Sequence, residues 1–198
     1  MTIGLRRSVL LGAPLFGYVV GMLHPTRLRL DQSPWLYIGI HLVMPVLIGL
    51  LAWMIVLLVE GIDNRAATTA RLLVVPFALV YSVFTAFAGL AYGVMVWKAG
   101  LLPATDQRGA VALIHDVFHN GLERAIYLTA GLLWLAAVVA AAVALRGRAP
   151  LPALVLLALG AVIFANSHER PWGPAGMAAI LAGVIWLEFK PNTVRTRR

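Results

Sequence analysis

Residues 35–59 read WLYIGIHLVMPVLIGLLAWMIVLLV and contain no Asp, Glu, Lys or Arg. A transmembrane α-helix needs about 20 consecutive, mostly apolar residues to cross the hydrocarbon core of a bilayer. Trp35 and Tyr37 stand at the start of the stretch, where aromatic side chains commonly mark the membrane–water interface. The stretch therefore predicts a membrane-spanning helix, and the rest of the chain follows the same pattern.

The composition extends this prediction to the whole chain. Of 198 residues, 61% are hydrophobic and 12% are charged, and the mean hydropathy is +0.88. A soluble domain of this size could not bury so much apolar surface. We therefore predict an all-α, polytopic membrane protein: a single transmembrane domain, residues 1–198, forming a bundle of six transmembrane helices. The spans are expected at about 8–24, 35–59, 72–97, 121–145, 151–166 and 174–189.

The basic residues predict an orientation. The net charge is +8, and Lys and Arg gather at the ends of apolar blocks, which favours anionic lipid headgroups at the cytoplasmic face over nucleic acid. With six spans, the side that holds both termini carries ten Lys and Arg, and the opposite side carries five, or six with Arg124. The positive-inside rule then predicts an N-in/C-in protein of the plasma or inner membrane.

Polar chemistry is concentrated in one stretch, residues 114–124, which reads IHDVFHNGLER. If the stretch is helical, His115, His119 and Glu123 recur every four residues and share one face. Two imidazoles one turn apart can bind the same metal ion. Glu123 or Asp116 could then act as the catalytic base on metal-bound water. The alternative interpretation is an amphipathic helix at the membrane surface, and residues 110–120 fit either that helix or the first turns of the next span.

Two more histidines are candidates for the same metal site. His41 lies inside an apolar span, where an ionisable group is costly and is expected to face the bundle interior. His168 lies in a short connection between two short spans. His24, which precedes Pro25 at a span end, is interpreted as an interfacial histidine. In the predicted orientation all five histidines fall at or near the non-cytoplasmic side, which predicts an outward-facing pocket.

Three functions remain open at this point. The first is a metal-dependent hydrolase, with zinc or another divalent ion held by His115, His119, His41 and His168, acting on a lipid or other amphiphile. The second is an electron-transfer protein with b-type haem bound by His41 and His119. The third is a scaffold or accessory subunit that forms homo-oligomers or binds a partner membrane protein.

Two further features of the sequence bear on these functions. The two Gly-x-x-x-Gly faces, Gly17–Gly21 and Gly89–Gly93, are the expected contacts of a scaffold, because small residues let transmembrane helices approach closely. The chain has no cysteine, which excludes thiolate sites. The methionines, Met44 among them, are scattered and are interpreted as core filling.

Overall fold

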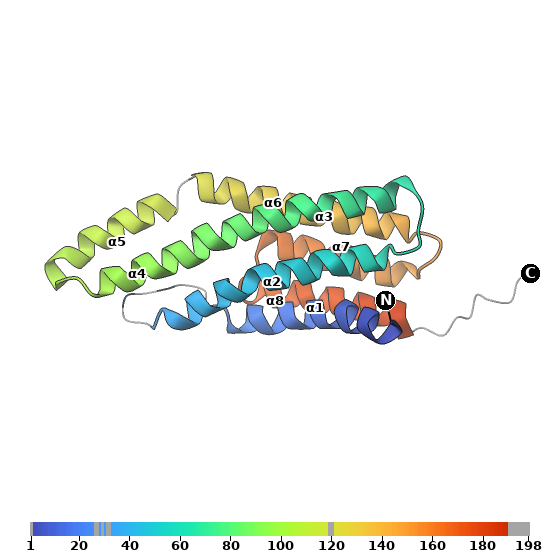
Figure 1. The fold of residues 1–198 in the computed structure, drawn as a ribbon, viewed down its shortest axis with the longest axis horizontal. Coiled ribbons are helices and arrows are strands. Elements are labelled where there is room, and N and C mark those ends of the chain that lie inside the picture. Colours follow the sequence, from blue (N-terminus) through green and yellow to red (C-terminus); the bar gives the residue numbers. More distant parts are fainter. Residues whose placement is uncertain (1, 26–27, 29, 31–32, 119–120, 190–198) are drawn as a thin grey trace, which may run out of the picture.

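The computed structural model describes residues 2–25, 28, 30, 33–118 and 121–189. These residues form helices that run back and forth along one axis (Figure 1). In chain order the helices are α1 (Ile3–Leu23), α2 (Trp35–Leu58), α3 (Arg65–Phe84), the π-helix η1 (Thr85–Ala91), α4 (Tyr92–Gly100), α5 (Ala104–Phe118), α6 (Gly121–Ala144), α7 (Leu151–Asn166) and α8 (Trp172–Phe189).

Five helical segments are long and apolar enough to cross a membrane. They are Ile3–Leu23, Trp35–Leu58, Arg65–Gly100, Gly121–Ala144 and Trp172–Phe189. The all-helical prediction and the membrane-protein prediction agree with this architecture. The expected fifth span, α7, is a shorter apolar helix, so the count of six spans and the N-in/C-in orientation stay predictions.

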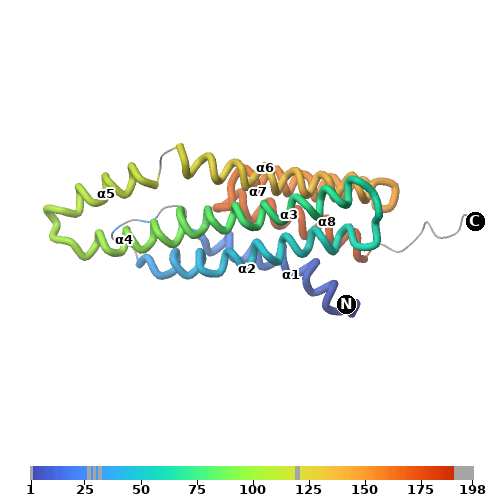
Figure 2. The backbone as a smooth tube through the Cα atoms, turned by 45° about the horizontal axis from the view of Figure 1, so that its top comes forward, coloured from blue at the N-terminus to red at the C-terminus, as the bar shows by residue number. Residues whose placement is uncertain are grey.

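The longest helical unit is built from three consecutive elements. α3, η1 and α4 follow one another without a break from Arg65 to Gly100, which is 36 residues (Figure 2). The expected span at 72–97 is therefore the middle of a longer helix. The π-helical segment widens the helix locally, a feature frequently found at functional sites. Within it, the Ala88 carbonyl accepts a hydrogen bond of 3.0 Å from the Tyr37 hydroxyl on α2.

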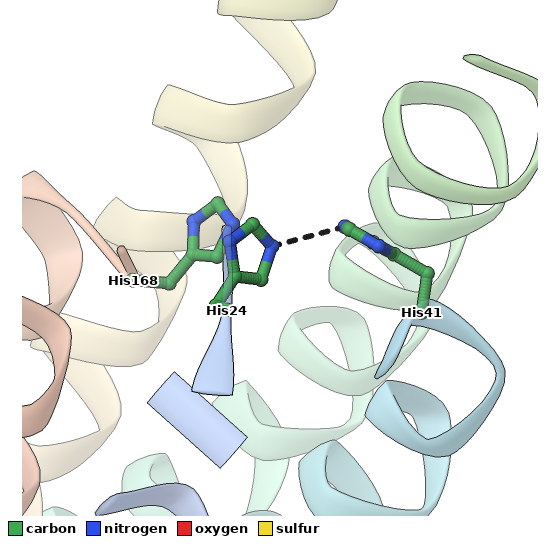
Figure 3. Close-up of side chains that lie close together, drawn as sticks. All are labelled: His24, His41 and His168. Atoms are coloured by element: carbon green, nitrogen blue, oxygen red, sulfur yellow. Dashed lines mark hydrogen bonds between the residues drawn. The ribbon is translucent and has the colours of Figure 1, made fainter. Parts of the chain in front are cut away.

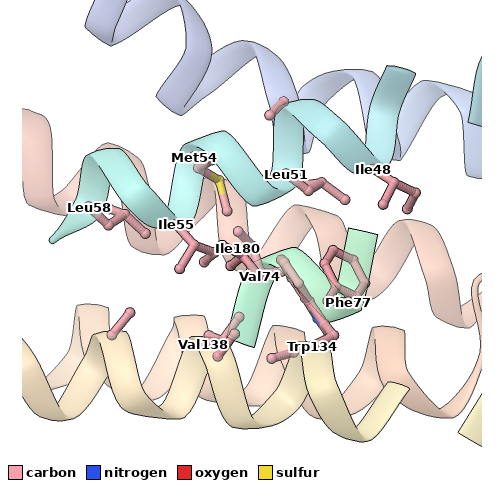
Figure 4. Packing of buried hydrophobic residues seen from close by; sticks show 14 of the residues in the cluster. Ile48, Leu51, Met54, Ile55, Leu58, Val74, Phe77, Trp134, Val138 and Ile180 are labelled. Carbon is pink, nitrogen blue, oxygen red and sulfur yellow. The ribbon is translucent and has the colours of Figure 1, made fainter. Parts of the chain in front are cut away.

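The main hydrophobic core lies where α2, α3, α6, α7 and α8 face one another. Trp134 of α6 is fully buried and packs against Phe77 of α3, with ring centroids 5.0 Å apart. Leu51 and Ile55 of α2 and Ile180 of α8 are fully buried in the same cluster (Figure 4). Many other large apolar side chains are exposed at the bundle surface, as expected for helices in contact with lipid.

The start of α1 and the end of α8 lie at the same end of the bundle (Figure 1). Arg6 bridges two carboxylates there: its Nη1 lies 2.6 Å from Glu188 Oε1 and its Nε lies 3.6 Å from Glu60 Oε2. Arg7 lies 3.4 Å from Glu188 as well. These ion pairs connect α1 to α8 and to the turn after α2, at the opposite end from His24.

Both Gly-x-x-x-Gly faces contact other helices of the same chain. A Cβ atom on Gly17 would lie 2.9 Å from Met177 Sδ, and one on Gly21 would lie 3.0 Å from Pro174 Cδ, both on α8. In the second motif, a Cβ on Gly93 would lie 2.8 Å from Ile38 Cγ1 on α2. The glycines therefore allow close packing within the bundle, as small residues do in membrane helices.

Candidate metal centre

Three histidine rings from separate parts of the chain converge inside the bundle (Figure 3). His24 follows α1, His41 lies in the second turn of α2, and His168 lies between α7 and α8. One nitrogen of each ring lies within 4.8 Å of one nitrogen of each of the others, which is close enough to hold a metal ion. His24 is 1% exposed and His41 is 2% exposed, whereas His168 is partly exposed.

Backbone carbonyls orient two of the rings. His24 Nδ1 lies 2.8 Å from the Pro25 carbonyl, and His41 Nδ1 lies 2.8 Å from the Tyr37 carbonyl. A carbonyl only accepts, so each Nδ1–H donates, and in a neutral ring the Nε2 atom then carries a lone pair. A hydrogen bond from a histidine to a backbone carbonyl is also the usual way in which proteins fix the tautomer of a metal-binding imidazole.

The two Nε2 lone pairs face each other. His24 Nε2 and His41 Nε2 lie 3.4 Å apart, the contact drawn as a dashed line in Figure 3. With both Nδ1 protons donated to carbonyls, a hydrogen bond between the Nε2 atoms would require one ring to be a cation. Two imidazoles bound to one tetrahedral ion at about 2.0–2.1 Å have nitrogens roughly 3.3 Å apart. The observed separation is therefore close enough for both nitrogens to bind one metal ion.

The loop between α7 and α8 brings the third ring to this point. The Gly173 amide donates to the Glu169 carbonyl at 2.7 Å, and the Glu169 amide donates to Ser167 Oγ at 3.2 Å. A Cβ on Gly173 would overlap the His168 carbonyl and lie 2.8 Å from His168 Cα, so only glycine fits there. The ring centroid of His168 lies 5.1 Å from that of His24. If the His168 ring moved by on the order of 1 Å, one of its nitrogens would come close enough to bind the same ion as His24 and His41.

Burial keeps the two histidines outside the spans in the neutral form. Burial, and then the nearby His41, lower the pKa of the His24 ring to about 4. Burial also lowers the pKa of the His168 ring well below its usual value, with smaller contributions from His24 and His41. A neutral imidazole is the form that binds metal, so protons compete little with an ion at this site.

Aromatic rings wall one side of the cluster. The ring of His168 packs against Tyr127, Phe84 and Tyr81 at centroid distances of 5.7, 5.7 and 6.1 Å. His168 Nδ1 and the hydroxyls of Tyr81 and Tyr127 are buried and have no hydrogen-bond partner among the residues that the structure describes. Buried polar atoms normally have a partner, so this is a place where an ion or a water molecule would be accommodated.

The π-helix places its backbone directly against His41. A Cβ on Gly89 would overlap Cδ2 and Cγ of the His41 ring and lie 2.7 Å from its Cβ. Glycine is therefore required at position 89 for His41 to take its observed position. Tyr37, whose carbonyl orients His41, is held in turn by its hydroxyl hydrogen bond to Ala88 in the same π-helix.

The expected metal ligands do not all lie at one site. His41 and His168 lie together with His24, which was predicted to be an interfacial histidine. His115 lies on α5, exposed at the rim of a separate cavity of about 290 Å³. That cavity is lined by Leu28, Leu30, Tyr92, Val96, Val111, Ile114 and His115. His119, expected to bind metal or haem, lies outside the described residues.

The two predicted catalytic carboxylates, Asp116 and Glu123, lie on different helices. Asp116 is exposed on α5. Glu123, at the start of α6, is half-buried and lies close enough to Glu169 for its charge to act there. Burial, and then this charge, raise the pKa of the Glu169 carboxyl, which follows His168 directly in the loop. Glu123 and Asp116 were predicted from the sequence as catalytic bases, and Glu169 was not.

The site could have been found only in part from sequence. The shared signal was that every histidine falls at or near the same side of the predicted bundle. His168 was among the predicted ligands, whereas His24, at the end of a helix, was interpreted as an interfacial histidine. No family model, curated protein or solved structure matches this chain.

Proposed function

We propose that this protein is a membrane metalloprotein in which His24, His41 and His168 bind one transition-metal ion. The observation that carries the proposal is the pair of Nε2 atoms 3.4 Å apart, both with their Nδ1 atoms next to backbone carbonyls. An ion satisfies both lone pairs at once, and three imidazoles form a common ligand set for a zinc-class ion.

The haem alternative fits this arrangement poorly. His41 Nε2 faces His24 Nε2 directly, and the hollow beside His24 and His168 has a volume of about 10 Å³. That volume admits about one water molecule, and a porphyrin is many times larger. The surroundings of His41 therefore favour a bare ion over haem as its ligand.

Hydrolysis of an amphiphile is the second candidate function, and Glu169 favours it. This half-buried carboxylate adjoins a proposed ligand and lies near Glu123. In such a reaction His24, His41 and His168 would hold the ion, which would activate water for attack on an ester carbonyl, and the Glu169 carboxylate would take the proton from that water and pass it to the leaving alcohol as the acyl–oxygen bond breaks. The substrate would be an ester at the membrane surface.

Metal analysis of the purified protein tests the main proposal. We expect detergent-purified wild type, stripped with a chelator and dialysed against Zn²⁺, to retain one ion per chain by elemental analysis. His41→Ala should retain none, because it removes one of two directly facing ligands.

His115→Ala is the matched control, because His115 lies at a different cavity, and it should retain the full amount. The proposal fails if the wild type retains no ion with Zn²⁺ or with any other first-row transition metal, or if His115→Ala loses the ion while His41→Ala keeps it. A lipid-ester assay on the same preparations tests the second candidate, for which Glu169→Gln should lose turnover but keep the ion.

A further inference from the structure

We infer that Met44 completes the His24–His41–His168 site and makes it selective for monovalent copper over zinc. This inference rests on the proposed function and names the ion that the site takes. Sequence analysis assigned Met44 to core filling because the methionines are scattered along the chain. The fold brings this one methionine to the histidines.

Met44 is the candidate for a fourth ligand because it adjoins two of the three histidines. It is 2% exposed and lines the same small hollow as His24 and His168. It also follows His41 by three residues on α2, and residues three apart share a helix face. The hollow, at about 10 Å³, has the size of an ion or one water molecule rather than of a substrate.

The charge of the site favours a monovalent ion. The cluster consists of three imidazoles, and no carboxylate belongs to it among the residues that the structure describes. A divalent ion held there would keep its full charge in a buried, low-dielectric place. By Born solvation the cost of desolvating an ion rises with the square of its charge, so a monovalent ion loses about a quarter as much.

The donor types favour the same ion. A thioether is a soft ligand that selects Cu(I), and imidazole also binds copper well. Zinc in proteins is bound by thiolate, imidazole and carboxylate, and a zinc site would gain little from a methionine. Three imidazole nitrogens with one thioether sulfur therefore form a set suited to Cu(I).

Competition with chromophoric chelators tests the inference on the full-length protein in detergent. Cu(I) affinity is measured without oxygen in the presence of ascorbate, and Zn(II) affinity is measured separately. Met44→Leu, which nearly conserves volume, should weaken Cu(I) binding at least about tenfold, in the range seen when groups around a metal are altered. Zn(II) binding by this variant should stay within about twofold of wild type, because the zinc ligands are the imidazoles.

Met54→Leu is the matched control, because Met54 is buried on the same helix and in the same hydrophobic core as Met44 but is not among the residues that line the hollow beside His24 and His168. It should leave both affinities unchanged. Wild type that binds Zn(II) more tightly than Cu(I), or a Met44→Leu variant that weakens neither metal or both equally, overturns the copper inference and leaves the metal site standing. Wild type that binds neither metal overturns the proposed function itself.

Discussion

Gly89→Ala is the sharpest single test of how the π-helix and the metal site depend on each other. The added methyl group would overlap Cδ2 and Cγ of His41 and lie 2.7 Å from its Cβ. Carbon atoms in ordinary contact lie about 3.5–4.0 Å apart, so the His41 side chain must move by roughly 1 Å or more. Metal sites tolerate ligand displacements of only about 0.2 Å.

The expected result follows from that difference. Gly89→Ala should weaken metal binding at least about 100-fold, at or beyond the upper end of the range for changes that act through a ligand's surroundings. The overpacked contact should also lower the free energy of unfolding by about 1–3 kcal/mol. Metal affinity by chelator competition and the thermal midpoint in detergent measure the two effects separately.

Gly49→Ala is the matched control, because a Cβ there meets nothing within 4 Å. Alanine is favoured over glycine in a helix interior by up to about 1 kcal/mol, so this variant should be slightly more stable and bind metal as wild type does. If Gly89→Ala binds metal with wild-type affinity, the position of His41 does not depend on the π-helix, and the reasoning is refuted.

Three further outcomes are expected. The pKa of the His24 ring is about 4 in the folded protein and 6.5 in the unfolded chain. Because only the unfolded chain takes up a proton between these two values, the free energy of unfolding decreases as the pH falls from 6.5 toward 4. The titration of His24 alone should cost metal-free protein about 2 kcal/mol between neutral pH and about pH 5, and the buried His168 adds to this loss. The loss is seen as a lower thermal midpoint that His24→Asn makes less sensitive to pH; an unchanged wild-type midpoint would contradict this. Glu188→Gln should lower the free energy of unfolding by about 1 kcal/mol, because the variant loses its ion pairs with Arg6 and Arg7. The thermal midpoint of the variant should also depend less on salt concentration. Trp134→Ala should lower the free energy of unfolding by about 3–5 kcal/mol but leave the metal stoichiometry unchanged. Loss of the metal in this variant would show that the metal site depends on the packing of the hydrophobic core.

The helices were predictable because their cause is local. An uncharged stretch such as residues 35–59 predicts its own helix, and α2 begins at the expected Trp35 and ends at Leu58. The boundaries of the third span were not predictable in this way. Polar residues between 65 and 71 suggested a loop, but Asn64 caps the helix by accepting a hydrogen bond from the Ala67 amide at 2.8 Å, and α3 begins at Arg65.

The metal centre depends on contacts between distant residues, which a single sequence records only weakly. His41 was expected to face the bundle interior, and it does. Its neighbour His24 could not be identified, because its partners, α2 and the 167–171 loop, come from elsewhere in the chain. The spacing of His115 and His119 suggested chelation by local periodicity, whereas the described cluster is assembled from three separate elements.

The uninterrupted helix from Arg65 to Gly100 has a geometric consequence. At about 1.5 Å per residue, its 36 residues extend roughly 54 Å, and the hydrocarbon core of a bilayer is about 30 Å thick. At a tilt of about 40° such a rod is still longer than the hydrocarbon core is thick, so wherever it crosses a bilayer at least one of its ends extends beyond the hydrocarbon.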